Sequence, residues 1–214
     1  MHSKESTGSP VPMSRRDFLR LSGVGFAAGA VLLGIIGPGK VLAQTSPNSH
    51  LMAEFVEAAE EYDLPASLLL AMGHVNTRWE MPPPEASAYK PGDPHGRGAY
   101  GIMQLVQNDF ENTLGEASEL TGISEERLKT DRKSNILGGA ALLAESQGEK
   151  PPRLGGYFGA VAGKGGRGKS FEAVTGVGAG ELYADQVFEM LRKGSSEKTL
   201  DGEEVDLPSQ EDQL

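Results

Sequence analysis

Apolar residues recur at the helical period through the middle of this chain, and this pattern constrains the fold more than any other feature. Leu51, Phe55, Ala58, Ala59 and Tyr62 fall at i, i+4, i+7, i+8 and i+11, which places them on one face of a helix. No alternating run of convincing length occurs that would predict a strand. We therefore expect an all-α domain with a core of its own.

Proline and glycine divide this helical region. Pro65 starts a second helix from Ala66 to about Arg78, which is apolar on several faces and should be the buried central helix. The run Met81-Pro82-Pro83-Pro84 ends it, because successive prolines cannot donate backbone hydrogen bonds. Further helices are predicted from Asn108 or Asp109 to Leu120, from Ser124, from Ser134 to Ser146 and from about Leu182 to Gly194, with loops at 82–99 and in the glycine-rich segment 155–180.

The first 43 residues have the three parts of a cleavable export signal. Arg15-Arg16 precede Phe18-Leu19, nineteen residues without charge follow from Leu21 to Gly39, and Val41-Leu42-Ala43 forms a small-residue exit. The paired arginines are typical of a twin-arginine signal peptide. An uncleaved membrane anchor is the alternative, but the glycine content and the cleavage-like site favour export without a stable anchor.

The other end of the chain and the overall composition exclude several functions. Residues 195–214 contain seven acids and one base, which predicts an acidic, disordered tail or linker after a domain at 44–194. The absence of cysteine excludes disulfides and thiolate sites, and the histidines have no metal-ligand spacing, so no metal or cofactor is expected. A net charge of −10 argues against nucleic acid as a partner.

Gly98-Ala99-Tyr100-Gly101-Ile102-Met103-Gln104 resembles the Gly-Ala-x-Gly-Leu-Met-Gln element of lytic transglycosylases (SLT domains) and goose-type lysozymes. Three further blocks are similar to that family in the same order: 68–78, 128–143 and 157–165. The resemblance implies a lysozyme-like helical domain, secreted to the cell wall, whose partner is the glycan strand of peptidoglycan. Similar domains precede amidase domains in cell-wall hydrolases, so the acidic segment resembles a linker to an amidase.

The residue that carries the family's chemistry is different here. The resemblance implies one glutamate, at the end of the second helix, that protonates the MurNAc–GlcNAc bond, but Asn76 stands at that position. An amide cannot act as a general acid. The family's supporting tyrosine aligns with Gly163. These two changes favour a degenerate, glycan-binding module, while an active lytic transglycosylase or muramidase using Glu80 or another carboxylate remains the alternative.

Several residues near these blocks are candidates for binding the glycan. Trp79 would either stack on a sugar or close the apolar end of the helix, and Gly101 would allow a tight turn and close backbone approach. The resemblance adds polar and aromatic candidates from the other blocks. The predicted substrate-binding set is Trp79, Tyr100, Gly101, Gln104 and Tyr157.

One segment supports two further hypotheses. Gly163–Ser170 matches the Gly-x4-Gly-Lys-Ser pattern of a phosphate-binding loop, and residues 157–162 could pass as the strand before it, but residues 171–180 are a poor helix and no second strand follows. Nucleotide binding is therefore a remote alternative. The wider stretch from Lys150 to Phe171 has five bases and no acid, so it would either bind anionic wall polymers or form a soluble surface loop.

Overall fold

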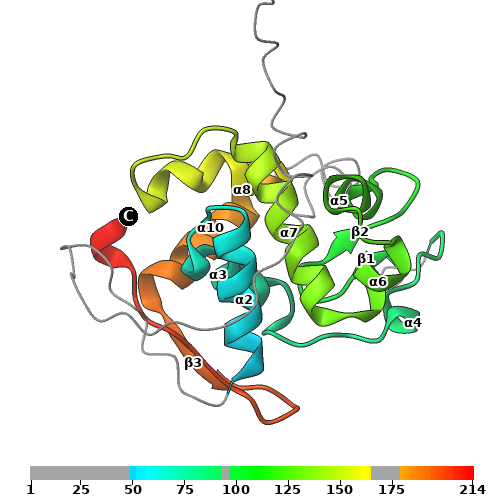
Figure 1. The fold of residues 1–214 in the computed structure, drawn as a ribbon, viewed down its shortest axis with the longest axis horizontal. Helices are drawn as coiled ribbons and strands as arrows, with labels where there is room; N and C mark the ends of the chain where they lie inside the picture. Colours follow the sequence, from blue (N-terminus) through cyan, green and yellow to red (C-terminus); the bar gives the residue numbers. More distant parts are fainter. Residues whose placement is uncertain (1–48, 93–96, 165–178) are drawn as a thin grey trace, which may run out of the picture. The chain divides into compact units, whose positions relative to one another are not determined.

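The computed structural model describes residues 49–92, 97–164 and 179–214, which belong to one compact unit spanning 42–214. This unit is mainly helical, which confirms the predicted class at that level (Figure 1). The export signal lies outside the described residues, as does most of Gly163–Ser170. The elements are α2 His50–Glu61, α3 Ala66–Thr77, α4 Pro84–Ser87, β1 Ala99–Tyr100, β2 Leu105–Val106, α5 Thr113–Thr121, α6 Glu125–Thr130, α7 Arg132–Gln147, η1 Leu154–Tyr157, α8 Phe158–Lys164, α10 Ala179–Lys193, β3 Ser195–Lys198, β4 Glu204–Leu207 and η2 Glu211–Gln213.

Helix α3 is the centre of the core. Seven consecutive residues, from Leu68 to His74, are buried, because the helix packs against α2, α7 and α10 on different sides. Figure 1 shows α2 and α3 in the middle of the unit, with α7 beside them. A helix that is apolar around most of its circumference is stable only in such a position, as the sequence predicted.

A side-chain cap and a glycine set two helix ends where the sequence predicted them. Ser124 caps α6 by accepting a hydrogen bond from the Arg127 N–H, and Gly122 ends α5 in the left-handed conformation. The start of α5 differs from the prediction, because Asn112 caps the helix at Thr113 and residues 108–111 form a turn instead. The segments predicted as loops also contain short helices, α4 and α8.

Two small antiparallel hairpins are the exception to an all-α fold. β1 pairs with β2, with Tyr100 opposite Leu105, and β3 pairs with β4, with Ser195 opposite Leu207. The sequence did not predict them, because β1 and β2 have two residues each and β3 has no apolar residue.

The second hairpin replaces the disordered tail or linker predicted for residues 195–214. Val205 and Leu207 are each 1% exposed and belong to the same core as the helices. Their side chains alternate with the exposed Glu204 and Asp206. The described end of the chain is thus part of the helical unit, and the domain boundary predicted at 194 is not a boundary in the structure.

Acidic residues that suggested disorder instead attach this hairpin to the helices. Glu203 accepts a hydrogen bond from the backbone N–H of Leu51, at 2.6 Å, and one from Arg132, at 2.7 Å. Leu51 lies in the first turn of α2 and Arg132 in the first turn of α7. A carboxylate is favourable at a helix N-terminus, where the backbone N–H groups have no partner within the helix.

No helix in the described ranges, 49–92, 97–164 and 179–214, is both long and apolar enough to cross a bilayer.

Candidate functional site

The loop from Gly98 to Gln107 forms a tight hairpin closed by backbone hydrogen bonds. Gly98 and Gly101 both have φ of +69°. A Cβ on Gly98 would lie 2.2 Å from the carbonyl oxygen of Gln107, and a Cβ on Gly101 would lie 2.3 Å from the side-chain nitrogen of Asn135. Both positions therefore require glycine, for conformation and for space.

The buried side chain of Asn135 holds this loop against α7. Its Oδ1 accepts a hydrogen bond from the Met103 N–H, at 2.7 Å, and its Nδ2 donates to the carbonyls of Tyr100, at 3.0 Å, and Leu128, at 2.8 Å. Asn135 is completely buried, so these bonds are protected from water. Two of the sequence blocks behind the family resemblance are thus in direct contact through one amide.

Tyr100 and Gln104 make contacts within this loop or directly beside it. The Tyr100 ring is 7% exposed, and the ammonium of Lys129 lies 4.7 Å from its centre in a cation–π contact. Gln104 donates from Nε2 to the carbonyl of Gly101 at 2.9 Å, within its own loop. Lys129 therefore covers one face of the Tyr100 ring, and the side-chain nitrogen of Gln104 already donates a hydrogen bond within the loop.

Asn76 lies in the last turn of α3, half-buried, and the chain makes an unusual exit directly after it. Arg78 and Trp79 both have positive φ, 55° and 65°. Among the described residues, four non-glycine residues have positive φ, and three of them, including Gln104, lie in this exit or in the 98–107 loop. Such conformations cost free energy and concentrate at functional sites.

The exit turns Trp79 into the core. Its ring is 1% exposed, its Nε1 donates to the carbonyl of Leu70 at 2.8 Å, and its edge packs on His74 with ring centroids 4.6 Å apart. No sugar face can reach this ring in the observed conformation. The alternative that the sequence left open, closing the apolar end of the helix, describes its position.

Around His74, a polar cluster joins α3 to the C-terminal hairpin. Glu197 Oε1 accepts hydrogen bonds from His74 Nε2 and Arg78, both at 3.1 Å, and from the Ser195 hydroxyl at 3.3 Å. Arg78 and then His74 hold the pKa of Glu197 below its ordinary value. A catalytic triad needs the acid and the serine on opposite ring nitrogens, but here both approach Nε2, so the cluster is not arranged for nucleophilic catalysis.

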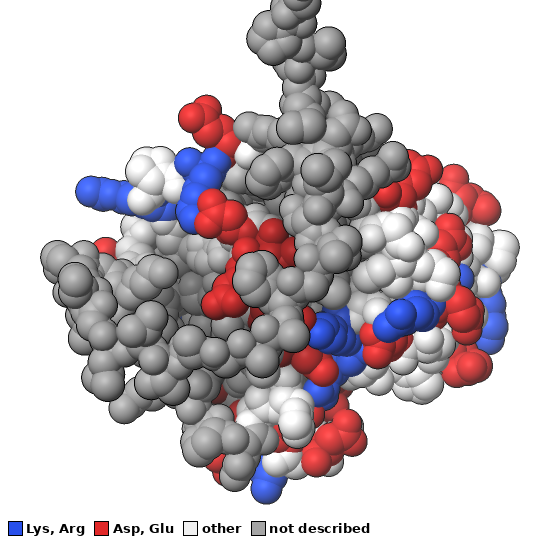
Figure 2. Space-filling view, viewed as in Figure 1, with Lys and Arg blue, Asp and Glu red and all other residues white. Residues whose placement is uncertain are grey.

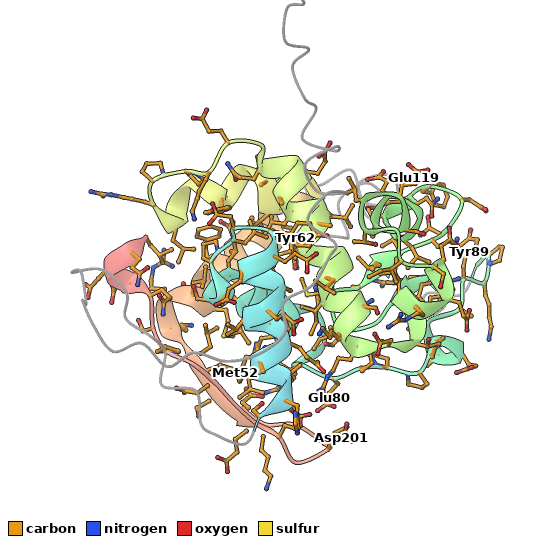
Figure 3. All side chains as sticks on the ribbon, viewed as in Figure 1. Met52, Tyr62, Glu80, Tyr89, Glu119 and Asp201 are labelled. Atoms are coloured by element: carbon orange, nitrogen blue, oxygen red, sulfur yellow. The ribbon has the colours of Figure 1, made fainter. Side chains whose placement is uncertain are left out.

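Glu80, the alternative acid, is bound by the same hairpin. Its Oε1 accepts a hydrogen bond from the backbone N–H of Leu200 at 2.8 Å, and Figure 3 shows it beside Asp201 at the tip of the hairpin. A catalytic acid of this kind lies in an apolar cleft, whereas Glu80 is half-buried and accepts a hydrogen bond from a backbone donor. This position fits a structural role better than a relocated acid.

The remaining candidates lie on η1 and α8. Tyr157 is 2% exposed, and its hydroxyl has no hydrogen-bond partner in the described part of the chain. Burial raises the pKa of Tyr157. Gly163 is exposed on α8, where an added Cβ would meet only the Ser146 hydroxyl, at 3.9 Å.

Within the ranges that the structure describes, no group of three or more histidine, aspartate and glutamate residues could hold a metal ion. No protein-family model matches the chain, and no curated protein is significantly similar to it.

Sequence reasoning did not identify the contacts that organise the site. Asn135 lies within the 128–143 block of the family resemblance, and Glu197 and Glu203 are two of the seven acids that predicted a disordered tail. One feature of the sequence could have indicated the role of Asn135, namely that its amide lies on the inner face of an apolar helix. A buried amide needs several hydrogen-bond partners, so such a position predicts contacts with other segments. The glutamates gave no comparable signal, because their partners are distant in sequence.

Proposed function

We propose that this protein is an exported, lysozyme-like module that binds the glycan strands of peptidoglycan and does not cleave them. The observation that carries the proposal is the contact of Asn135 with Tyr100 and Met103. It joins two blocks that sequence resemblance alone had assigned to one family. A chance match to separate motifs would not require the matched residues to pack on each other.

The absence of cleavage follows from the residue at the family's acid position. Asn76 lies in the last turn of α3, as the resemblance requires for the catalytic glutamate, and its amide is too weak an acid to protonate a glycosidic oxygen. Glu80, the nearest carboxylate along the chain, is hydrogen-bonded to the hairpin. Both observations favour the binding module over the active enzyme.

The test uses residues 42–214, which form the compact unit, with insoluble peptidoglycan. The protein should sediment with the polymer, and the soluble fraction should contain no new muropeptides by mass spectrometry. The variant Asn76→Glu, alone and combined with Gly163→Tyr, should sediment equally and should gain release of soluble muropeptides. Failure of the wild-type unit to sediment would contradict the proposal.

The partner protein is part of the same proposal. Similar modules precede amidases, and a cell-wall amidase is the enzyme whose action would benefit from a non-cleaving glycan anchor. Co-sedimentation of such an amidase only in the presence of the unit would support this pairing, and independent sedimentation would contradict it.

A further inference from the structure

Among the residues that the structure describes, Phe110 is the aromatic residue with a highly exposed side chain. It is 60% exposed, whereas Trp79, Tyr100 and Tyr157, the three aromatic residues that the sequence suggested for sugar contact, are buried. In the described part of the chain, the other large apolar side chains with high exposure are Leu182 and Leu200, which are aliphatic. A single exposed apolar side chain needs no explanation by itself, so the surroundings of Phe110 decide its meaning.

The turn that presents Phe110 is held rigidly. Asn108 Oδ1 accepts hydrogen bonds from the backbone N–H groups of Phe110, at 2.9 Å, and Glu111, at 3.0 Å, and Asn108 Nδ2 donates to the Arg97 carbonyl at 2.9 Å. The same residue's backbone N–H donates to the Glu111 carbonyl. Because these hydrogen bonds already hold the turn, a ligand that binds it does not lose binding free energy to ordering the backbone.

Tyr89 connects this turn to the loop that carries the family resemblance. Its hydroxyl donates to Asp109 Oδ2 at 2.9 Å, directly before Phe110. Its Cβ lies 3.2 Å from the position that a Cβ on Gly98 would take, so Tyr89 packs against the first glycine of the loop. Figure 3 places Tyr89 at the outer edge of the unit, on the side of β1 and β2.

The charge of this side makes an anionic ligand unfavourable. Figure 2 shows more acidic than basic side chains along the rim where Figure 1 places α5 and α6, whose glutamates Glu116, Glu119, Glu125 and Glu126 outnumber the bases Arg127 and Lys129. Such a net acidic surface disfavours nucleic acid and polyphosphate polymers. A neutral ligand with an apolar face would bind without that cost.

From these observations we infer that Phe110 and Tyr89 form an aromatic platform on which an uncharged sugar ring of the glycan strand stacks. This inference rests on the proposed function and names the surface responsible for it. The apolar C–H face of a pyranose ring matches an exposed aromatic ring, and the rigid turn and the contact with Gly98 hold the platform beside the loop.

The test is a sedimentation titration of residues 42–214 with peptidoglycan from which the stem peptides have been removed. Phe110→Ala should weaken binding by about three- to tenfold, since one aromatic contact contributes on the order of 1 kcal/mol. Phe110→Trp should bind at least as well as wild type. Leu182→Ala is the matched control, because it removes an exposed apolar side chain from α10, and it should leave binding unchanged.

Ionic strength separates stacking from charge. Between about 0.05 and 0.5 M salt, wild-type binding should not weaken, because stacking is not screened and salt reduces the repulsion between the lactyl carboxylates of the stripped strands and the acidic protein. The inference is overturned if the wild type binds while Phe110→Ala binds equally well, if Leu182→Ala loses as much as Phe110→Ala, or if binding weakens steeply as salt rises. If the wild type does not bind stripped glycan at all, the proposed function fails together with it.

Discussion

Replacing Asn135 by alanine should destabilise the protein more than any surface substitution. The change leaves the Met103 N–H and the carbonyls of Tyr100 and Leu128 without the amide that they contact in a fully buried position. Each buried polar group that loses its partner costs about 1–3 kcal/mol, and carbonyls with a second lone pair fall at the lower end. We therefore expect a loss of about 3–5 kcal/mol in the free energy of unfolding.

The measurement is thermal unfolding of residues 42–214, followed by circular dichroism. For a unit of this size each kcal/mol lowers Tm by about 2–4 °C, so the expected decrease is about 6–20 °C. Asn112→Ala is the matched control, since Asn112 is an exposed cap of α5 whose loss should cost about 1 kcal/mol. A decrease for Asn135→Ala no larger than that of the control would refute the role assigned to this amide.

Three further predictions concern the hairpin, the loop and the tryptophan. Burial alone would raise the pKa of Glu203, but the hydrogen bonds from the Leu51 N–H and from Arg132 lower this pKa below its ordinary value. The ionised Glu203 therefore stabilises the fold at pH values above the ordinary pKa, and this stabilisation is lost as the pH falls through the lowered pKa. Glu203→Gln should therefore lower the free energy of unfolding at neutral pH by about 1–3 kcal/mol, and denaturant titrations should show a smaller further decrease between about pH 5 and pH 2 than in the wild type. An unchanged dependence of the free energy of unfolding on pH would contradict this. Gly101→Ala should lower Tm by as much as Asn135→Ala, because the residue has positive φ and its Cβ would overlap the amide, and a variant with wild-type Tm would show that the loop can move away. Trp79, the only tryptophan of the chain, should emit at short wavelength and resist iodide quenching with or without glycan, and a glycan-dependent shift in its emission would contradict its burial.

The helical core could be predicted from the sequence because its signals are local. The stripe from Leu51 to Tyr62 and the apolar run of α3 follow from the helical period, and caps such as Ser124 act within one turn. These elements have the predicted bounds within one or two residues.

The C-terminal hairpin could not be predicted, because the contacts that hold it are distant in sequence. Glu203 bonds to a backbone N–H 152 residues away and to Arg132, 71 residues away, and a glutamate that caps a distant helix looks the same in the sequence as one that faces solvent. Val205 and Leu207 alone are too few to indicate a buried strand.

The burial of Trp79 could not be predicted for a comparable reason. It depends on two successive residues with positive φ, and because neither is glycine, no local pattern indicates the sharp exit from α3. The aromatic residue that the structure exposes, Phe110, lies instead in a segment that the sequence predicted as the start of a helix.

The most direct test of the central claim is the soluble fraction of a peptidoglycan digest. Wild-type residues 42–214 and Glu80→Gln are each incubated with the polymer, the pellet is assayed for protein, and the supernatant is read by mass spectrometry. We expect protein in the pellet and no anhydro- or hydrolysed muropeptides above the buffer control, because the amide of Asn76 is too weak an acid to protonate the glycosidic bond. Release of such products by the wild type that is lost in Glu80→Gln would show that the module is an enzyme and contradict the account.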